Sequence, residues 1–282
     1  MTRLLIVLHI YYHEQVDYFI SKLRNINGCE WDLTVTYSSK NENTVRKILD
    51  LKPDAEFIHV ENHGYDVWPF IKAIQTKDID NYDFIMKLHT KNIENFKWKI
   101  NGLKLVGESW RNLLVDAMLR SSEQFSTCLN KFAEHPETGM ICSYELCVMP
   151  SYKYQEDTDM LLKEGKRIGI MDARQMFCAG TMFITRPECL KKIREASFDS
   201  TSWFSSNQSH SMATLAHVYE RLFGAAVADA GYTLTGVPSD IKTYKALRRH
   251  RLISPVLKGI FSINYIEGGR KCLTILGMKF PL

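Results

Sequence analysis

The first ninety residues alternate between apolar runs typical of buried strands and segments whose apolar side chains recur at helical spacing. In residues 14–25, for example, Val16, Phe19 and Leu23 fall on one helical face. The pattern predicts strands at 3–10, 32–37, 56–60 and 82–88, and helices at 14–25, 42–51 and 66–74. This alternation indicates an α/β domain whose mostly parallel sheet is flanked by helices.

The second half of the chain continues this pattern less regularly. It predicts strands at 139–143 and 177–185 and helices at 108–132, 187–196 and 211–231. Residues 150–176 are polar and mixed, so this stretch is either a mobile loop or an insertion. Because no internal repeat or low-complexity linker divides the chain, we expect one domain at 1–240, with halves 1–92 and 93–240, and an extension at 241–282.

Length and composition indicate a folded chain. With 282 residues and 45% apolar side chains, a disordered or fibrous protein is excluded. No window approaches the roughly eighteen apolar residues of a membrane span, and the apolar N-terminus has no cleavage site, so we expect a soluble body that begins with a buried strand. The seven cysteines include no C-x-x-C pair, which predicts reduced cytosolic thiols rather than a zinc site.

The net charge of +4 is unevenly distributed. Six basic residues lie among leucine, isoleucine and valine side chains in the segment 242–258: Lys242, Lys245, Arg248, Arg249, Arg251 and Lys258. This pattern predicts a basic helix, which either docks on an anionic membrane surface or is a solvated surface helix. We expect no nucleic acid partner, because the chain has no recognised binding motif and no basic stripe interleaved with aromatic residues.

Polar, aromatic or glycine residues directly follow several predicted strands, and ligands bind at the carboxyl ends of strands in open α/β sheets. After the first strand, His9 and Tyr11 either contact a nucleobase or belong to the core. After the third strand, Asn62 and Gly64 form a turn in which the glycine allows a ligand to approach closely. Asp66 then binds a ligand, caps the next helix, or does both.

The fourth predicted strand ends in positive charge, with Lys87, His89 and Lys91 at alternate positions. Fixed cations suit a diphosphate because they stabilise the charge of a departing group, although a basic surface loop would have the same sequence. In the segment 177–186, Gly180 either leaves room for a substrate against the backbone or packs tightly in a core strand, and Thr181 follows it.

The order and spacing of six short segments resemble the rhamnan synthesis protein F family of polysaccharide glycosyltransferases. The segments are H-x-Y-Y at 9–12, N-x-G-x-D-hydrophobic-x-P-F at 62–70, K-L-H-T-K at 87–91, Trp110-Arg111, G-T-M-F at 180–183 and E-R-L-F at 220–223. The likeness spans about residues 4–235 and leaves the extension uncovered. His63 stands where the family more often has arginine.

The resemblance implies transfer of rhamnose, galactose or a related hexose from a nucleotide diphosphate sugar to a lipid-linked or growing cell-surface polysaccharide of the O-antigen, capsule or rhamnan type. Such an enzyme is expected in the cytoplasm, peripherally at the inner face of the plasma membrane. Residues 1–92 would bind the nucleotide and 93–240 would face the acceptor. The implied donor-binding residues are His9, Tyr11, Asn62, Gly64, Asp66, Lys87, His89, Lys91, Arg111, Gly180, Thr181 and Arg221.

The chain is also similar to the GT-A architecture of nucleotide-sugar glycosyltransferases, in which an apolar strand ends in a D-x-D motif that holds a divalent metal. Here the corresponding strand ends in His89-Thr90-Lys91, so an imidazole and an ammonium replace the two carboxylates, whereas hard cations need oxygen ligands. We therefore expect Lys91, helped by Lys87 and His89, to neutralise the diphosphate directly, without a metal or other cofactor.

The GT-A pattern also places an acidic general base about eleven residues before a glycine that precedes the final strand. Glu220 lies eleven residues before Gly231 and is the predicted base of an inverting transfer, with Asp66 as the second candidate. Alternatively, Glu220 and Arg221 only brace their helix through local ion pairs. Two other classes remain open, a non-catalytic carbohydrate- or nucleotide-sugar-binding subunit and a metal-dependent nucleotidyltransferase.

Overall fold

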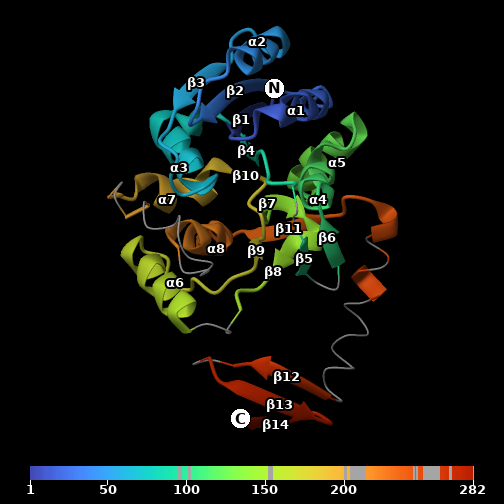
Figure 1. Cartoon of the computed structure of the whole chain (residues 1–282), viewed down its shortest axis with the longest axis vertical. Helices are drawn as coiled ribbons and strands as arrows, with labels where there is room; N and C mark the ends of the chain where they lie inside the picture. The colour runs from blue at the N-terminus through green and yellow to red at the C-terminus, as the bar shows by residue number, and fades with distance from the viewer. Residues whose placement is uncertain are drawn as a thin grey trace.

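The chain folds around a seven-stranded sheet (Figure 1). The computed structural model describes residues 1–94, 97–100, 103–151, 155–199, 202–203, 214–243, 245, 247–249, 261–266 and 269–281. In sheet order, the strands are β11 (Thr233–Val237), β7 (Thr138–Ser143), β10 (Phe183–Thr185), β4 (Phe84–His89), β1 (Arg3–Ile10), β2 (Glu30–Tyr37) and β3 (Glu56–His59). Strand β10 is antiparallel to β4 and β7, and the other pairs are parallel, so the predicted mostly parallel α/β sheet is confirmed.

The two central strands, β1 and β4, form the middle of the core. Apart from Arg3, every residue of both strands is buried, which explains why they read as continuous apolar runs in the sequence. Their register runs from Leu4 beside Phe84 to His9 beside His89. The two histidines therefore meet at the carboxyl ends of the strands.

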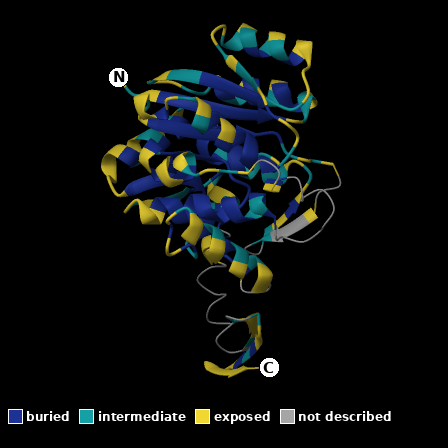
Figure 2. Cartoon of the chain, turned by 90° about the vertical axis from the view of Figure 1, so that its left-hand side faces the viewer, coloured by how far each residue is buried: buried dark blue, intermediate teal, exposed yellow. Residues whose placement is uncertain are grey.

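Helices cover both faces of this sheet (Figures 1 and 2). On one side lie α1 (Val16–Leu23), α2 (Glu42–Leu51), α4 (Ser109–Leu119) and α5 (Ser122–Glu134), and on the other α3 (Val67–Thr76), α6 (Gln155–Arg167), α7 (Lys191–Glu195) and α8 (Leu215–Asp229). In α1 the face predicted from the sequence, with Val16, Phe19 and Leu23, is the buried one. The helices thus cover the faces of the sheet but not the ends of the strands, where the connecting loops lie.

Two predicted elements are each divided in the structure. The helix predicted at 108–132 is the pair α4 and α5, because Ser121 has an extended backbone and its hydroxyl accepts a hydrogen bond from Gln124 N at 3.2 Å, which caps α5. The strand predicted at 177–185 is β9 (Phe177–Cys178) followed by β10. Strand β9 pairs with β8 (Cys147–Val148) outside the main sheet.

Other boundaries also differ from the prediction. The undecided stretch 150–176 contains α6, and a hairpin of β5 (Lys97–Ile100) and β6 (Leu103–Val106) precedes α4. Residues 211–213, predicted to start the last helix, lie outside the described part of the chain. Short 3-10 turns occur at His13–Gln15, Ile79–Asn81, Tyr144–Leu146 and Pro187–Leu190.

The helix predicted for the basic segment is present where the structure describes it, at residues 241–243, 245 and 247–249, but the C-terminal extension is not helical to its end. Residues 261–281 form a separate antiparallel sheet of β12 (Phe261–Tyr265), β13 (Lys271–Ile275) and β14 (Met278–Pro281). Alternation of apolar and polar residues favours strands in this last part of the extension. Residues 244, 246 and 250–260 of that segment, with Arg251 and Lys258, lie outside the described residues.

Among the residues that the structure describes, no helix combines the length and the apolar character required to cross a bilayer.

Gly224 in α8 offers a test of the packing between this helix and β9. A Cβ at this position would lie 2.1 Å from the carbonyl oxygen of Met176 and 2.8 Å from Cα of Phe177, and backbone atoms cannot move aside cheaply. Gly224→Ala should therefore lower the free energy of unfolding by roughly 1–3 kcal/mol, although alanine favours helix by about 1 kcal/mol. Urea denaturation measures the change, and a stabilised variant would contradict this packing.

The matched control is Ala228→Gly, at an exposed position of the same helix. It should cost only the helix propensity of about 1 kcal/mol.

Candidate functional site

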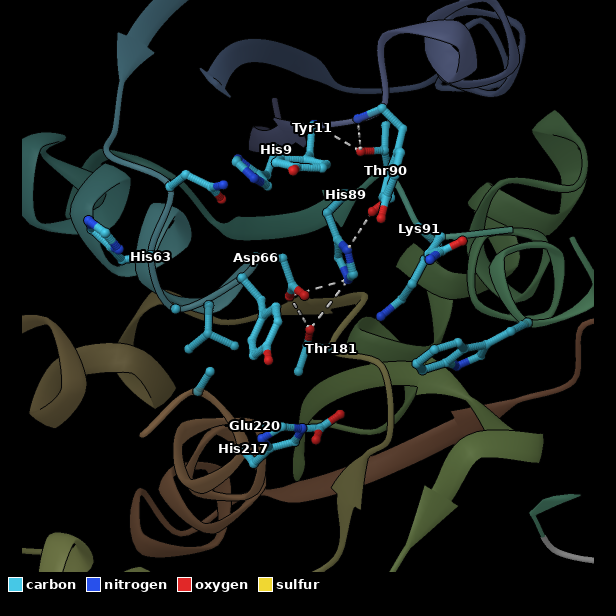
Figure 3. Close-up of a pocket in the computed structure, with 18 residues that line it drawn as sticks. His9, Tyr11, His63, Asp66, His89, Thr90, Lys91, Thr181, His217 and Glu220 are labelled. Atoms are coloured by element: carbon cyan, nitrogen blue, oxygen red, sulfur yellow. Dashed lines mark hydrogen bonds and ion pairs between the residues drawn. The ribbon is translucent and has the colours of Figure 1, made fainter. Parts of the chain in front are cut away.

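A cavity of about 530 Å³ opens at the carboxyl ends of β1 and β4 (Figure 3). It lies where ligands bind in open α/β sheets. Its walls come from the ends of both strands, the turn before α3, the loop before β10 and the first turns of α4 and α8. The lining residues are His9, Tyr11, Tyr12, Asn62, His63, Gly64, Tyr65, Asp66, Val67, His89, Thr90, Lys91, Asn92, Trp110, Thr181, Ala216, His217 and Glu220.

Asp66 is the centre of a polar cluster on the floor of this pocket. Its Oδ2 accepts hydrogen bonds from Nζ of Lys87 and Oγ1 of Thr181, both at 2.5 Å, and lies 3.3 Å from Nε2 of His89. Lys87 also donates to the Thr181 carbonyl oxygen at 3.0 Å. The carboxylate makes no capping hydrogen bond to α3, so the cluster, rather than the helix N-terminus, accounts for its position.

Burial and charge act in opposite directions on the ionisation of this cluster. Burial disfavours the charged form of Asp66, but the neighbouring positive charges, Lys87 among them, outweigh it and hold the pKa of Asp66 well below its usual value. Burial lowers the pKa of Lys87, and the attraction of Asp66 offsets part of this effect. Burial also lowers the pKa of His89 well below its usual value.

His89 faces hydrogen-bond acceptors with both ring nitrogens. Nε2 lies 2.8 Å from the carbonyl oxygen of Gly180, and Nδ1 lies 3.2 Å from the carbonyl oxygen of Thr90. His89 therefore ties the end of β4 to the loop before β10.

Two loops with left-handed backbone bring these side chains together. In the turn before α3, Gly64 and Tyr65 have φ of 63° and 53°, and in the loop before β10, Gly180 and Thr181 have φ of 101° and 52°. A Cβ on Gly64 would lie 2.6 Å from the Trp203 ring, so only glycine fits there. These turns aim Asp66 and Thr181 at Lys87, and such strain is typical of functional sites.

Glu220 and Lys91 supply opposite charges to the pocket wall (Figure 3). Oε1 of Glu220 on α8 accepts a hydrogen bond from Gly180 N at 2.7 Å. Nζ of Lys91 lies 4.0 Å from the centroid of the Trp110 ring. Burial lowers the pKa of Lys91, while the carboxylates of Asp66 and Glu220 act to raise it.

Residues of the first and third strands line the opposite wall. Nδ1 of His9 lies 3.0 Å from Oγ1 of Thr36, and burial lowers the pKa of His9 to about 4. This buried and partnered histidine agrees with the core interpretation, although its ring also borders the pocket. The Tyr11 ring is half exposed, while its backbone N–H donates to Oγ1 of Thr90 at 3.0 Å. Asn62 lines the same wall.

The structure does not bring every predicted donor-binding residue into the pocket. Lys87 lies below the floor, paired with Asp66, and Gly180 does not line the pocket, although its backbone is bonded to Glu220 and His89. Arg111 packs its guanidinium 3.7 Å from the Tyr18 ring centroid and pairs with Glu108 at 3.2 Å.

Arg221 likewise lies outside the pocket. It packs over the Phe177 ring and donates to the carbonyl oxygen of His217. Both arginines follow a pocket residue in sequence, Trp110 and Glu220, and successive residues point in different directions around a helix.

Sequence reasoning missed Trp110, His217, Tyr65 and Thr90 as pocket residues. Trp110 was only part of the Trp110-Arg111 pair of the resemblance. His217 carried a usable signal, because it precedes Glu220 by three residues and so shares its helical face. Tyr65 gave no signal in the sequence, because its left-handed backbone conformation is visible only in the structure.

Among the described residues, no group of three or more histidines, cysteines, aspartates or glutamates is placed to hold a metal ion. The bonded oxygen of Asp66 already accepts from an ammonium and a hydroxyl.

The Asp66–Lys87 pair gives a stability prediction. Asp66→Asn or Lys87→Met alone should each lower the free energy of unfolding by about 3–5 kcal/mol, because either leaves a buried charge without its partner. The double variant should cost clearly less than the sum, which urea denaturation of all four proteins measures. Additive costs would show that the two groups do not interact.

The same pair sets a pH dependence. The pKa of Asp66 is lower in the folded protein than in the unfolded chain, where it is about 3.9. The stability that the Asp66 carboxylate contributes is therefore complete above a pH of about 3.9 and is lost as the pH falls through the folded pKa. Asp66→Asn should therefore lose less stability than wild type on acidification below pH 4.

Comparisons with known proteins agree with the expected family. The family described as rhamnan synthesis protein F matches residues 1–232. Two curated relatives, both named "Uncharacterized protein WxcX", from strains B100 and ATCC 33913 of Xanthomonas campestris pv. campestris, are 26% identical over 235 residues. The aligned part is 82% of this chain but 32% of theirs, so the chain spans about a third of their length.

Solved structures resemble the fold only distantly. The mannosyltransferase PcManGT from Pyrobaculum calidifontis, in complex with GDP-Man and Mn2+, is 14% identical with a TM-score of 0.45, over 92% of this chain and 64% of that one. Residues 1–349 of TarS from S. aureus are 11% identical with a TM-score of 0.44, over 89% and 65%. Likenesses this low carry no argument about activity. The family match, in contrast, covers residues 1–232 and so contains every residue that lines the pocket. This chain therefore belongs to the rhamnan synthesis protein F family.

Proposed function

We propose that this chain is an inverting glycosyltransferase. It transfers a hexose, rhamnose or galactose or a close relative, from a nucleotide diphosphate sugar to a lipid-linked or growing cell-surface polysaccharide. The observation that carries the proposal is the pocket at the ends of β1 and β4, in which an ammonium, Lys91, and a carboxylate, Glu220, share one cavity. Family membership supports a role in polysaccharide synthesis.

The donor is proposed to lie along the ends of β1 and β4. Lys91 would neutralise the diphosphate, and the Trp110 ring beneath its ammonium keeps the charge in place. The half-exposed Tyr11 ring offers a face on which a base can stack. Lys87 acts indirectly in this arrangement, by fixing Asp66 and Thr181 on the pocket floor.

Glu220 is the proposed general base. Its carboxylate would take the proton of an acceptor hydroxyl while the hydroxyl oxygen attacks the anomeric carbon. The bond from that carbon to the diphosphate breaks on the opposite face, and Lys91 stabilises the charge of the departing nucleoside diphosphate. The hydrogen bond from Gly180 N holds one carboxylate oxygen and so fixes the orientation of the base.

Catalysis without a metal is part of the proposal. This part of the proposal rests on two observations. His89 and Lys91, rather than two carboxylates, lie at the end of β4, and Asp66 is already paired with Lys87.

The primary experiment is a thermal-shift screen of the whole chain against UDP-, dTDP- and GDP-sugars. At a hundredfold excess over the dissociation constant, the correct donor should add about 2.7 kcal/mol of stability. The bound donor is then tested for turnover with and without chelator. Metal-independent release of nucleoside diphosphate supports the proposal, binding without turnover indicates a non-catalytic subunit, and metal-dependent release of pyrophosphate indicates a nucleotidyltransferase.

Lys91→Ala should lower turnover at least tenfold, because the departing diphosphate loses its fixed cation. Initial rates of nucleoside diphosphate release measure the effect, and excess chelator should leave the wild-type rate unchanged. Lys163→Ala, on the exposed side of α6, is the matched control and should behave as wild type. Loss of activity with chelator and recovery with manganese would overturn this role for the strand end.

Glu220→Gln should lower transfer by about two orders of magnitude or more, the usual scale for a lost general base. Donor binding should persist, because the glutamine side-chain oxygen can still accept from Gly180 N. Transfer rates and donor-induced thermal shifts separate the two effects, with Glu156→Gln on the exposed surface of α6 as control. Near-normal transfer would move the base elsewhere, with Asp66 as the next candidate.

A further inference from the structure

The small C-terminal sheet β12–β14 stands apart from the seven-stranded sheet in Figure 1 and has an unusual distribution of side chains. Its register places Ile263 opposite Leu273 and Leu273 opposite Phe280, so these three side chains form one row across all three strands. Ile275 and Met278, also opposite each other, lie on the same face. One face of the sheet is therefore almost wholly apolar.

This apolar face is the open one. Met278, Ile263 and Phe280 are 58%, 56% and 45% exposed. Within the central strand, Ile275 on this face is 37% exposed, whereas Cys272 and Thr274 on the other face are 3% and 9% exposed. The exposed edge residues of that other face include the polar Asn264 and Lys279. A water-soluble sheet normally covers its apolar side, so an exposed apolar face marks a contact surface.

The hairpin between β13 and β14 adds a second feature. Leu276 and Gly277 connect the paired residues Ile275 and Met278, and both have positive φ, 49° and 83°, as in a type I′ turn. Asparagine or glycine suits the first of these positions, whereas leucine is strained there. Leu276 is nevertheless present and 72% exposed, so the turn projects a large apolar side chain into the surroundings.

The charge of the extension indicates what this face contacts. Residues 241–282 contain nine lysines and arginines and one acidic residue, whereas residues 1–240 contain 27 basic and 31 acidic residues. Arg270, Lys271 and Lys279 of the sheet region are exposed. Two copies meeting face to face would bring two strongly positive segments together, which is unfavourable. An anionic lipid surface offers both the opposite charge and an apolar layer.

We propose that the open face of β12–β14, with Leu276 at its tip, is a membrane-contact surface that inserts into an anionic lipid layer. The basic residues of the extension provide the long-range attraction, and the apolar row provides the short-range contact. The surface holds the pocket near a lipid-linked acceptor, and its own function does not depend on the transfer reaction.

The decisive variant is Leu276→Asn in the whole chain. It creates the Asn-Gly pair preferred in type I′ turns, so the hairpin should fold at least as well as in wild type. Binding to vesicles of phosphatidylcholine and phosphatidylglycerol should nevertheless weaken about tenfold, because the variant lacks the leucine side chain that inserts into the lipid. Vesicle flotation measures binding, and thermal unfolding checks the fold. Met171→Asn, at a 74% exposed site on the main domain, is the matched control and should bind as wild type.

Two further measurements separate the charge from the apolar contact. Arg248, Arg249 and Arg251 replaced together by glutamate should abolish binding, and raised salt should weaken the binding of wild type. Vesicles of phosphatidylcholine alone should bind poorly. Donor hydrolysis in solution should be unchanged in all these variants, so a failure here is distinguishable from failure of the proposed enzymatic function.

Three outcomes would overturn the proposal. Wild type that does not float with anionic vesicles has no such surface. Equal flotation of wild type and Leu276→Asn would show that the sheet makes no contact with lipid. A dimer in sedimentation velocity that Leu276→Asn dissociates would show instead that the face binds a second copy.

Discussion

The buried pair of Lys87 and Asp66 is the interaction on which the candidate site depends. The ammonium lies in the central strand β4 with its side chain almost inaccessible to water, and it is bonded both to the carboxylate and to Thr181. A charge in such surroundings is tolerable only with a partner, so the turn before α3 and the loop before β10 must both fold over it. The same requirement accounts for the left-handed residues in both loops.

The rest of the pocket follows from that arrangement. Once the loop before β10 is fixed, the Gly180 carbonyl oxygen binds His89 and its N–H binds Glu220. A Cβ on Gly180 would lie 2.8 Å from Nε1 of Trp110, so this loop packs directly against the ring that supports Lys91. One short segment of backbone thereby connects the Lys91 ammonium, the Glu220 carboxylate and the floor of the pocket. Such a connection holds the side chains in fixed positions, which catalysis by positioning and electrostatics requires.

Charge and apolar surface divide the chain into two unlike parts. The first 240 residues carry a small excess of acidic groups and bury their apolar residues in one core, whereas the extension is strongly basic and leaves an apolar sheet face open. Surfaces of this kind attract anionic layers at long range and hold them at short range. Together, the proposed donor pocket and the proposed membrane-contact surface would let one chain act where a lipid-linked acceptor lies.

The sequence by itself determined the α/β class, because the periods of strands and helices are local properties of the chain. It also indicated a site at the strand ends that carry His9 and His89 and at the turn after β3 that carries Asp66, since parallel strands place their carboxyl ends at one edge. Only the tertiary structure decided that Lys87 is a buried partner while Lys91 borders the pocket, and that Arg111 and Arg221 point away from it. The reason is physical: side-chain direction and left-handed loops depend on contacts between segments far apart in sequence, which no local pattern records.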